Sequence, residues 1–209
     1  MELKNLSVAE FAAITASDAP APGGGSVSAL AGSIAAALGE MVARLTVGRE
    51  KYASSEAEMQ VVIDTFPAVR EKLMNAVDED SKAFDQYMAA LAMPKSTDEE
   101  KAARSAAMQE GLKAAARVPL GVAQAIDTLF PCLEKAVTIG NPNAVTDGMV
   151  GTMMARTGIL GALFNVRVNL ESIKDEAFVA ELSAETDKLQ KSATEWEQKI
   201  LSQVKLARI

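Results

Sequence analysis

The feature that most constrains this chain is a stretch of very small residues that begins at Gly23 and continues as far as Leu38. Three consecutive glycines lead into a run of alanine, serine, glycine and leucine, and the small members recur at helical spacing. Such a stripe lets a neighbouring helix approach unusually closely. We therefore predict a helix over residues 26–48 that packs tightly against another helix.

A second segment with the same character follows the turn-forming run GNPN, which starts at Gly140. Glycine and alanine recur through residues 145–170, which predicts a second closely packed helix. Two helices with such stripes gain little burial area alone, so we expect them to pack against each other or against a second subunit. We predict a homodimer.

The other helices are predicted from capping patterns and apolar periodicity. Capping boxes begin at Ser7 and at Thr97. Pro67 is expected to kink or divide its helix, and Pro119 to break the chain or start a new helix. The predicted ranges are 7–16, 55–92, 97–116, 119–138 and 175–207. No alternating strand pattern is present, so we predict an all-α bundle of six to eight helices in one domain over residues 1–209.

Composition excludes several classes of protein. Hydrophobic residues make up 49% of the 209 residues, enough for a sizeable core, but aromatic residues only 4%. A net charge of −7 without a basic patch argues against a nucleic-acid surface. The single cysteine, Cys132, cannot form an intrachain disulfide, which suits the cytoplasm. The N-terminus has no secretory pattern, and the apolar run 27–38 is too short to span a membrane.

The chain contains no histidine, which removes the commonest general base and the commonest zinc ligand. Any acid–base chemistry must use aspartate, glutamate, lysine, tyrosine or solvent. The acidic clusters also lack the spacing of metal ligands. We therefore predict no metal site and no bound cofactor.

The glycine loop is a candidate binding element. Gly23, Gly24 and Gly25 allow a ligand or another segment to approach the backbone closely, and Ser26 is a candidate N-cap for the helix that follows. Unpaired N–H groups and the positive end of the helix dipole would then face an anion. The spacing is not that of a nucleotide-binding loop. The alternative is a glycine-rich helix entry without any ligand.

Four segments together resemble one enzyme family. They are PGGGSVSALAGSIAAALGEMVARLTVGREKY, DEDSKAFD, MPKST and GNPNAVTDG with the later NVRVNL, in this order along nearly the whole chain. The sequence resembles the cyclodeaminase/cyclohydrolase family of folate enzymes. The resemblance implies an all-helical dimer with its active site near the subunit interface, a one-carbon tetrahydrofolate substrate and no metal. No formiminotransferase segment is recognised here, which leaves the exact reaction open.

The chemistry of that family is compatible with the residues present. In cyclodeamination, N10 of the folate attacks the formimino carbon on N5 and ammonia leaves, whereas in cyclohydrolysis water adds to the resulting cation. Both reactions pass through a tetrahedral carbon beside positive charge. A carboxylate can stabilise that charge and act as the base, and an ammonium or second carboxyl group can protonate what leaves.

Three residues are the catalytic candidates. Asp80 matches the aspartate of the family's D-x-x-x-F pattern, and Asp147 follows the GNPNAVT turn. Lys51 is the candidate polarising cation or acid, provided that burial lowers its pKa. Each has an ordinary alternative: Asp80 as a solvated residue, Asp147 as a helix cap, and Lys51 as a cation near a helix C-terminus.

Substrate binding is assigned to the glycine loop with Ser26 and to four further residues. Arg44 would pair with the carboxylates of the folate tail, and it shares a helix face with Lys51 if the helix persists. Asn165 and Asn169, one turn apart, would bind the edge of the pterin. Arg104 is also a candidate, with a surface ion pair as its alternative. Phe84 is expected to belong to the core.

The leading hypothesis is a formiminotetrahydrofolate cyclodeaminase; whether its folate substrate is polyglutamylated stays open. Methenyltetrahydrofolate cyclohydrolase is the alternative within the same family. Two other classes remain open, namely a non-catalytic helical dimerisation module and an anion-binding protein that uses the glycine loop. Turnover of a tetrahydrofolate separates the first two hypotheses from the last two.

Overall fold

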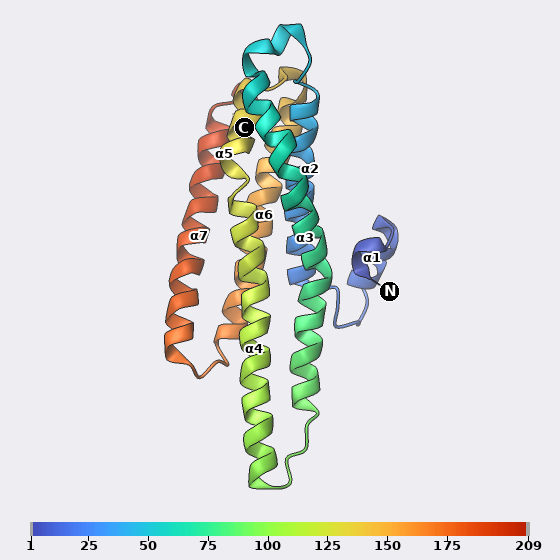
Figure 1. Cartoon of the computed structure of the whole chain (residues 1–209), viewed down its shortest axis with the longest axis vertical. Coiled ribbons are helices and arrows are strands. Elements are labelled where there is room, and N and C mark those ends of the chain that lie inside the picture. The colour runs from blue at the N-terminus through green and yellow to red at the C-terminus, as the bar shows by residue number, and fades with distance from the viewer. Residues whose placement is uncertain (1, 208–209) are drawn as a thin grey trace.

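The computed structural model describes residues 2–207, and in that range the chain forms seven α-helices and no strand (Figure 1). This confirms the predicted all-α class. The helices are α1 (Val8–Thr15), α2 (Gly24–Arg44), α3 (Glu56–Leu91), α4 (Asp98–Asp127), α5 (Phe130–Ile139), α6 (Val145–Leu170) and α7 (Glu176–Ser202). Short 3₁₀ turns, including Glu50–Ser55, connect some of them.

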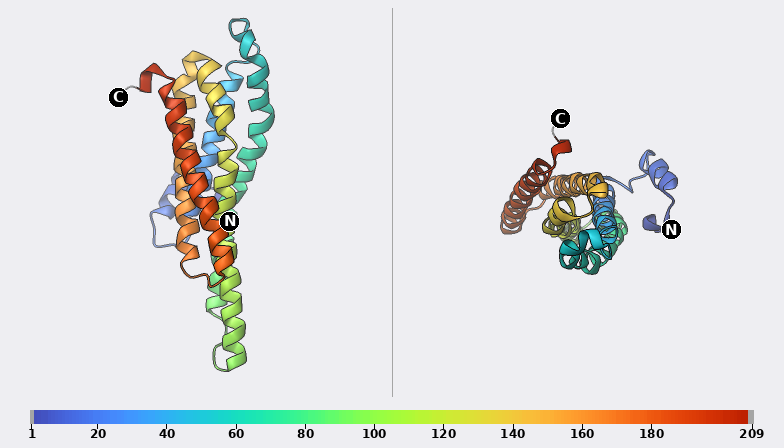
Figure 2. Two further views of the ribbon diagram at one scale, coloured as in Figure 1. Left: turned by 90° about the vertical axis from the view of Figure 1, so that its left-hand side faces the viewer. Right: turned by 90° about the horizontal axis from the view of Figure 1, so that it is seen from above.

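Four long helices form the body of the bundle. α2 packs most extensively against α6 and α3, and α4 packs against both α3 and α6. α7 lies along the outer side of α6, as the view from above shows (Figure 2). The largest fully buried side chains are Phe66, Phe130, Met59, Leu73, Ile126, Leu129, Leu133, Ile159, Leu163 and Ile200.

Glycines explain why α2 and α6 lie so close together. A Cβ atom on Gly158 would come within 3.0 Å of the Ser28 carbonyl oxygen, and one on Gly151 within 3.2 Å of the Leu38 Cβ. Both distances leave little room for a side chain, so the predicted close packing of the two segments is confirmed. By length and composition alone both helices could cross a membrane, but core helices pass the same test.

Several predicted boundaries are wrong. α2 begins at Gly24 and ends at Arg44, so it is shorter at its C-terminal end than the predicted 26–48. Both Pro67 and Pro119 lie inside unbroken helices. Each proline removes one backbone hydrogen bond, but buried residues on both sides of it hold the helix in the bundle. The capping boxes at the starts of α1 and α4 are confirmed.

Two parts of the chain stand apart from the body. α1 has no buried residue and projects to one side, while the segment before it is held by Asp78, whose carboxylate accepts the Leu3 N–H at 2.6 Å. At the other extreme, α3 and α4 continue past the end of α6 as a projecting hairpin (Figures 1 and 2). The candidate site lies near the base of this hairpin.

Candidate active site

A cavity of about 290 Å³ opens where the start of α2 meets α3, α4 and α6. It is lined by Pro20, Ala21, Gly23, Gly24, Gly25, Asp80, Ser81, Phe84, Ala115, Asn165, Val168 and Asn169. The fold therefore brings together the glycine loop, one of the three catalytic candidates and both asparagines. These groups are distant in sequence, and the sequence analysis selected each of them separately.

Asp80 is positioned by Ser26. The Ser26 hydroxyl lies 3.0 Å from the Val77 carbonyl oxygen and 3.2 Å from Oδ2 of Asp80, so its single proton is directed at these two acceptors. Ser26 is fully buried and does not line the cavity. The predicted N-cap role of Ser26 is wrong, because Gly23 is the N-cap and no side chain caps α2. Its influence on a ligand would pass through Asp80 and not through direct contact.

The glycine loop gives Asp80 the space it occupies. A Cβ atom at Gly25 would overlap the Asp80 carboxylate, and one at Gly24 would lie 3.1 Å from Nδ2 of Asn165. The loop thus permits close approach, as expected from the sequence. Because the first turn of α2 lines the cavity, the positive end of its helix dipole also faces this space.

Burial raises the pKa of the Asp80 carboxyl above its ordinary value, and the hydrogen bond from Ser26 opposes that rise. Among the residues that line the cavity, Asp80 is the one with a titratable side chain. A partly desolvated carboxylate beside a cavity has the properties of a general base or acid, because proton transfer is most effective when the pKa lies near the working pH.

Two amides face the cavity from α6. Asn165 donates its Nδ2 proton to the Gly161 carbonyl at 2.9 Å, and Asn169 donates to the carbonyls of Asn165 at 2.8 Å and of Ala115 at 3.1 Å. Their nitrogen atoms are therefore held by the helices. The side-chain oxygens remain as acceptors for the N–H groups of a heterocycle.

Two of the lining residues that the sequence analysis did not assign to the site are Ser81 and Phe84. The Ser81 hydroxyl is buried and has no hydrogen-bond partner among the described residues. Phe84 is 39% exposed, so the prediction that it belongs to the core is wrong. A hydrophobic residue at helical spacing looks the same in sequence whether it faces a core or a cavity. The position of Ser81 directly after the candidate Asp80 is the sequence signal that could have identified it.

The other two catalytic candidates lie at the opposite end of the bundle. Lys51 is exposed in the Glu50–Ser55 turn after α2, and Asp147 lies in the first turn of α6. The 21 residues of α2 separate the two ends by about 30 Å. Within one chain, Lys51 and Asp147 thus do not share a site with Asp80. Asp147 does not cap α6 with its side chain either.

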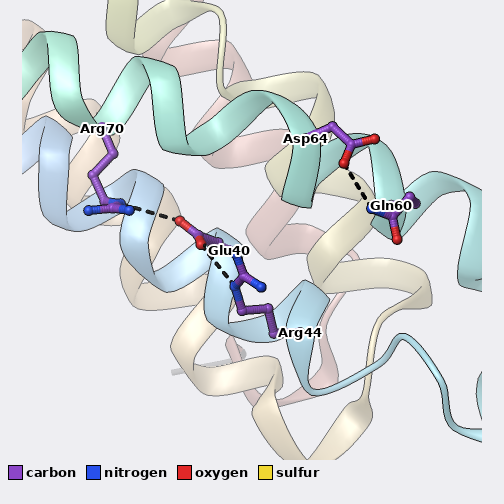
Figure 3. A network of polar contacts seen from close by, with 5 residues as sticks. All are labelled: Glu40, Arg44, Gln60, Asp64 and Arg70. Atoms are coloured by element: carbon purple, nitrogen blue, oxygen red, sulfur yellow. Dashed lines mark hydrogen bonds and ion pairs between the residues drawn. The ribbon is translucent and has the colours of Figure 1, made fainter.

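Arg44 belongs to an ion-pair network at that same end (Figure 3). Its guanidinium lies 2.7 Å from Oε1 of Glu40, and Nε of Arg70 on α3 lies 3.3 Å from Oε2 of the same carboxylate. Since α2 ends at Arg44, the expectation that Arg44 and Lys51 share a helix face is wrong. The network joins α2 to α3.

Arg104 lies in the second turn of α4, toward the tip of the projecting hairpin. Its Nε and Nη2 donate to the Leu91 carbonyl oxygen at 3.2 and 3.1 Å, so it caps the C-terminal end of α3 instead of forming the alternative surface ion pair. Among residues 2–207, no three acidic or cysteine side chains cluster closely enough to hold a metal ion.

This arrangement suits proton transfer to or from a ligand that fits beside Asp80. The sequence profile of the formiminotransferase-cyclodeaminase family matches residues 7–188. The chain belongs to this family. The match extends over α1 to α6 and about the first half of α7, so it includes every residue of the cavity, and it confirms the resemblance noted in the sequence.

Relatives in the family differ in length and in name. A methenyltetrahydrofolate cyclohydrolase from Methylorubrum extorquens is 37% identical over 96% of this chain and 97% of its own length. A formimidoyltransferase-cyclodeaminase from Sus scrofa is 41% identical over 78% of this chain, which corresponds to only 30% of that protein. The crystal structure of a formiminotetrahydrofolate cyclodeaminase from Thermotoga maritima is 31% identical, covers 97% of both chains and has a TM-score of 0.86.

Proposed function

We propose that this chain is a folate one-carbon enzyme that converts 5-formiminotetrahydrofolate to 5,10-methenyltetrahydrofolate and ammonia. The observation that carries the proposal is the Asp80 carboxylate, which is partly desolvated and held by Ser26 at a cavity where the first turn of α2 and two amides converge. The cyclodeaminase named among the solved structures shares the fold over nearly the whole chain.

Asp80 would act on the proton at N10. As N10 attacks the formimino carbon on N5, the carboxylate accepts the N10 proton, and a tetrahedral carbon bearing three nitrogen atoms results. The Asp80 carboxyl then returns this proton to the nitrogen of the former formimino group, the bond between that nitrogen and the carbon breaks, and ammonia and the methenyl cation result. The negative carboxylate stabilises this cation as it forms. The asparagine oxygens would accept hydrogen bonds from the pterin and hold its ring in place.

Cyclohydrolysis is the second candidate, because the cyclohydrolase from Methylorubrum extorquens is similar over 96% of this chain. In that reaction Asp80 would take a proton from water as the oxygen adds to the methenyl carbon. The ring then opens to 10-formyltetrahydrofolate. The two reactions share the same cation, so one site can serve either.

Absorbance of the conjugated methenyl cation separates the candidates. Purified protein is mixed with 5-formiminotetrahydrofolate in one cuvette and with methenyltetrahydrofolate in another. We expect absorbance to rise with release of ammonia in the first. An accelerated fall in the second alone would assign the cyclohydrolase reaction. Silence in both, with the protein folded, would favour the non-catalytic helical module.

A homodimer is the second part of the proposal. Large apolar side chains remain exposed along α2 and α6, although both helices lie in the body of the bundle. These are Val27, Ile34 and Met41 on α2, and Val150, Met153, Phe164 and Val168 on α6, each at least 40% exposed. On α2 they recur every seven residues and so form one face. A second copy would bury this face.

A two-fold axis across α2 would also explain why the catalytic candidates Asp80 and Lys51 lie at opposite ends of one chain. Such an axis pairs the helices in opposite directions, which brings the Lys51 end of one copy toward the Asp80 end of the other. Mixing two inactive variants tests this arrangement. Asp80→Asn and Lys51→Ala protein, unfolded together and refolded, should recover about a quarter of the wild-type activity, because half of the dimers hold one intact site.

Each variant refolded alone is the control and should stay inactive. If sedimentation gives a monomer at micromolar concentration, the dimer proposal is wrong. If the mixture forms dimers but recovers no activity, Lys51 does not act across the interface.

A further inference from the structure

A second cavity, of about 500 Å³, runs from beside the Asp80 cavity along the projecting hairpin toward its tip. It is lined by Tyr87, Lys95, Lys101, Arg104, Ser105, Met108, Gln109, Leu112, Ser172 and Lys174. These residues come from the end of α3, the α3–α4 connection, α4 and the connection between α6 and α7. We call it the hairpin cavity.

Three segments of the chain line both cavities, so the two cavities lie next to each other. α3 contributes Phe84 to the first cavity and Tyr87 to the second. α4 contributes Ala115 and Leu112 in the same way, and the chain at the end of α6 contributes Asn169 and then Ser172. In each case the step is three residues, close to one helical turn, or about 5 Å. A single elongated ligand can therefore occupy both cavities.

The hairpin cavity carries a strong positive charge. Lys95, Lys101, Arg104 and Lys174 line it, and no acidic residue does. This concentration of cations contrasts with a net charge of −7 for the whole chain. Of the four, Lys101 forms an ion pair at 2.9 Å with Asp98, and Asp98 itself does not line the cavity.

The backbone that carries Lys174 is fixed in place. Gln109 on α4 accepts the Lys174 N–H at 2.8 Å, and its own amide donates to the Ser172 carbonyl at 3.0 Å. This pair of bonds ties the α6–α7 connection to the wall of the hairpin cavity. Arg104 is likewise oriented by its two bonds to the Leu91 carbonyl, which leave its third nitrogen, Nη1, free of them.

We propose that the hairpin cavity binds the carboxylates at the glutamate end of the folate substrate while the one-carbon end lies against Asp80. This inference rests on the proposed function. A folate places an aminobenzoyl group between its pterin and its glutamate, so the two ends must occupy separate places along one line. Asp80 and Tyr87 are seven residues apart on α3, or about 10 Å, which matches the scale of that spacer.

Another cavity with lysines provides the contrast. It is lined by residues of α7, including Lys188, Lys191 and Lys199. Each of these lysines is within 3.8 Å of a carboxylate, on Glu185, Glu195 and Glu134 in turn. Their charge is thus already compensated within the chain. Lys191 is a matched control, because its replacement removes one exposed lysine charge away from the Asp80 cavity.

The experiment compares two substrates and three proteins. The substrates are the one-carbon tetrahydrofolate that the wild type turns over and the corresponding tetrahydropteroate, which lacks the glutamate. The proteins are the wild type, the double variant Lys95→Gln/Lys174→Gln, and Lys191→Gln. Arg104 is left unchanged because it also caps α3.

We expect the double variant to raise KM for the glutamate-bearing substrate about fivefold, as for two partly exposed ion pairs, without changing kcat. Its KM for the pteroate should equal that of the wild type, and Lys191→Gln should alter neither value. Added salt should reduce the difference between the two substrates. A substrate with further glutamates should bind more tightly to the wild type.

The outcomes keep the two proposals separate. If the wild type turns over both substrates with the same KM, or if the double variant behaves as the wild type, the hairpin cavity does not bind the tail and the proposed reaction stands. If the wild type turns over neither substrate, the proposed function fails, and this inference fails with it.

Discussion

The two ends of α2 each lie beside an acidic side chain, but the partners of these two carboxylates differ. At the first end, Ser26 and Gly25 hold one carboxylate, Asp80, which has no basic partner among residues 2–207, and they leave it beside a cavity. At the last end, Glu40 is nearly buried but is compensated by Arg44 and Arg70 (Figure 3). The first arrangement leaves a carboxylate beside a cavity with only a hydroxyl as its side-chain partner, whereas the second holds a carboxylate between two guanidiniums that join α2 to α3.

The difference teaches which acidic groups in such a bundle are available for chemistry. A carboxylate that lies between two guanidiniums, as Glu40 does, is already engaged in ion pairs that join two helices. A carboxylate that is desolvated and held only by a hydroxyl has a raised pKa and can accept a proton. Four changes test this contrast, from the largest expected effect to the smallest.

Removing the charge of Asp80 should have the largest effect. Asp80→Asn keeps the size of the side chain but cannot accept a proton, so kcat should fall by about 10²- to 10⁴-fold. Steady-state kinetics measures this loss. Asp85→Asn, an exposed aspartate on the same helix, is the control and should keep its activity. An active Asp80→Asn enzyme would remove Asp80 from the mechanism.

Filling the space at Gly25 should have the next largest effect. Gly25→Ala places a methyl group where the Asp80 carboxylate lies, so the carboxylate must move. We expect kcat/KM to fall about 10²-fold and the free energy of unfolding to fall by about 1–3 kcal/mol. Gly24→Ala places its methyl group 3.1 Å from the Asn165 amide nitrogen, so its kcat/KM and its free energy of unfolding should fall less. Equal effects at the two positions would contradict the assigned steric role.

Removing the hydroxyl of Ser26 should shift the pH dependence. The hydrogen bond from Ser26 lowers the pKa of Asp80 against the effect of burial, so Ser26→Ala should raise that pKa. A base with a higher pKa loses its deprotonated form at a higher pH, so the acidic limb of kcat/KM should move to higher pH. The loss in rate should be about fivefold to tenfold, the value of one hydrogen bond.

Ser33→Ala is the matched control for Ser26. Ser33 is also buried on α2, but its hydroxyl donates to the Arg70 carbonyl oxygen at 3.2 Å and lies two turns from the cavity. Its pH profile should equal that of the wild type. If the profile of Ser26→Ala also stays in place, the hydroxyl has only a packing role.

Removing the charge of Glu40 should have the smallest effect. Glu40→Gln leaves Arg44 and Arg70 without a negative partner, but their side chains are 57% and 43% exposed and remain hydrated. The free energy of unfolding should therefore fall by only about 1 kcal/mol, as measured by urea denaturation. A loss several times larger would mean that this end, too, depends on a desolvated charge.

The fold follows from the sequence because each of its signals is local. Capping boxes, the absence of alternation and the small-residue stripes are properties of short segments, and they predicted the class and the tight α2–α6 contact. The helix breaks predicted at Pro67 and Pro119 are absent, because the turns on both sides of each proline contain buried residues. Local propensity does not register that tertiary packing.

The candidate site was predicted only in part. Asp80, Asn165 and the glycine loop could be selected from the family pattern, and the fold gathers them. The sequence could not show that about 30 Å of helix separates Lys51 from Asp80 in one chain, because it did not indicate that Asp80 packs against the first turn of α2. Nor did it distinguish the exposed Phe84 from a core residue.

The unbroken course of α3 has a mechanical consequence. This helix of 36 residues carries Arg70 in the ion-pair network, then Asp80 at the first cavity, then Tyr87 at the hairpin cavity. One continuous helix carries all three groups, so a movement of this helix displaces them together. A sideways force at the tip of the hairpin would tilt α3 and move the Asp80 carboxylate with it.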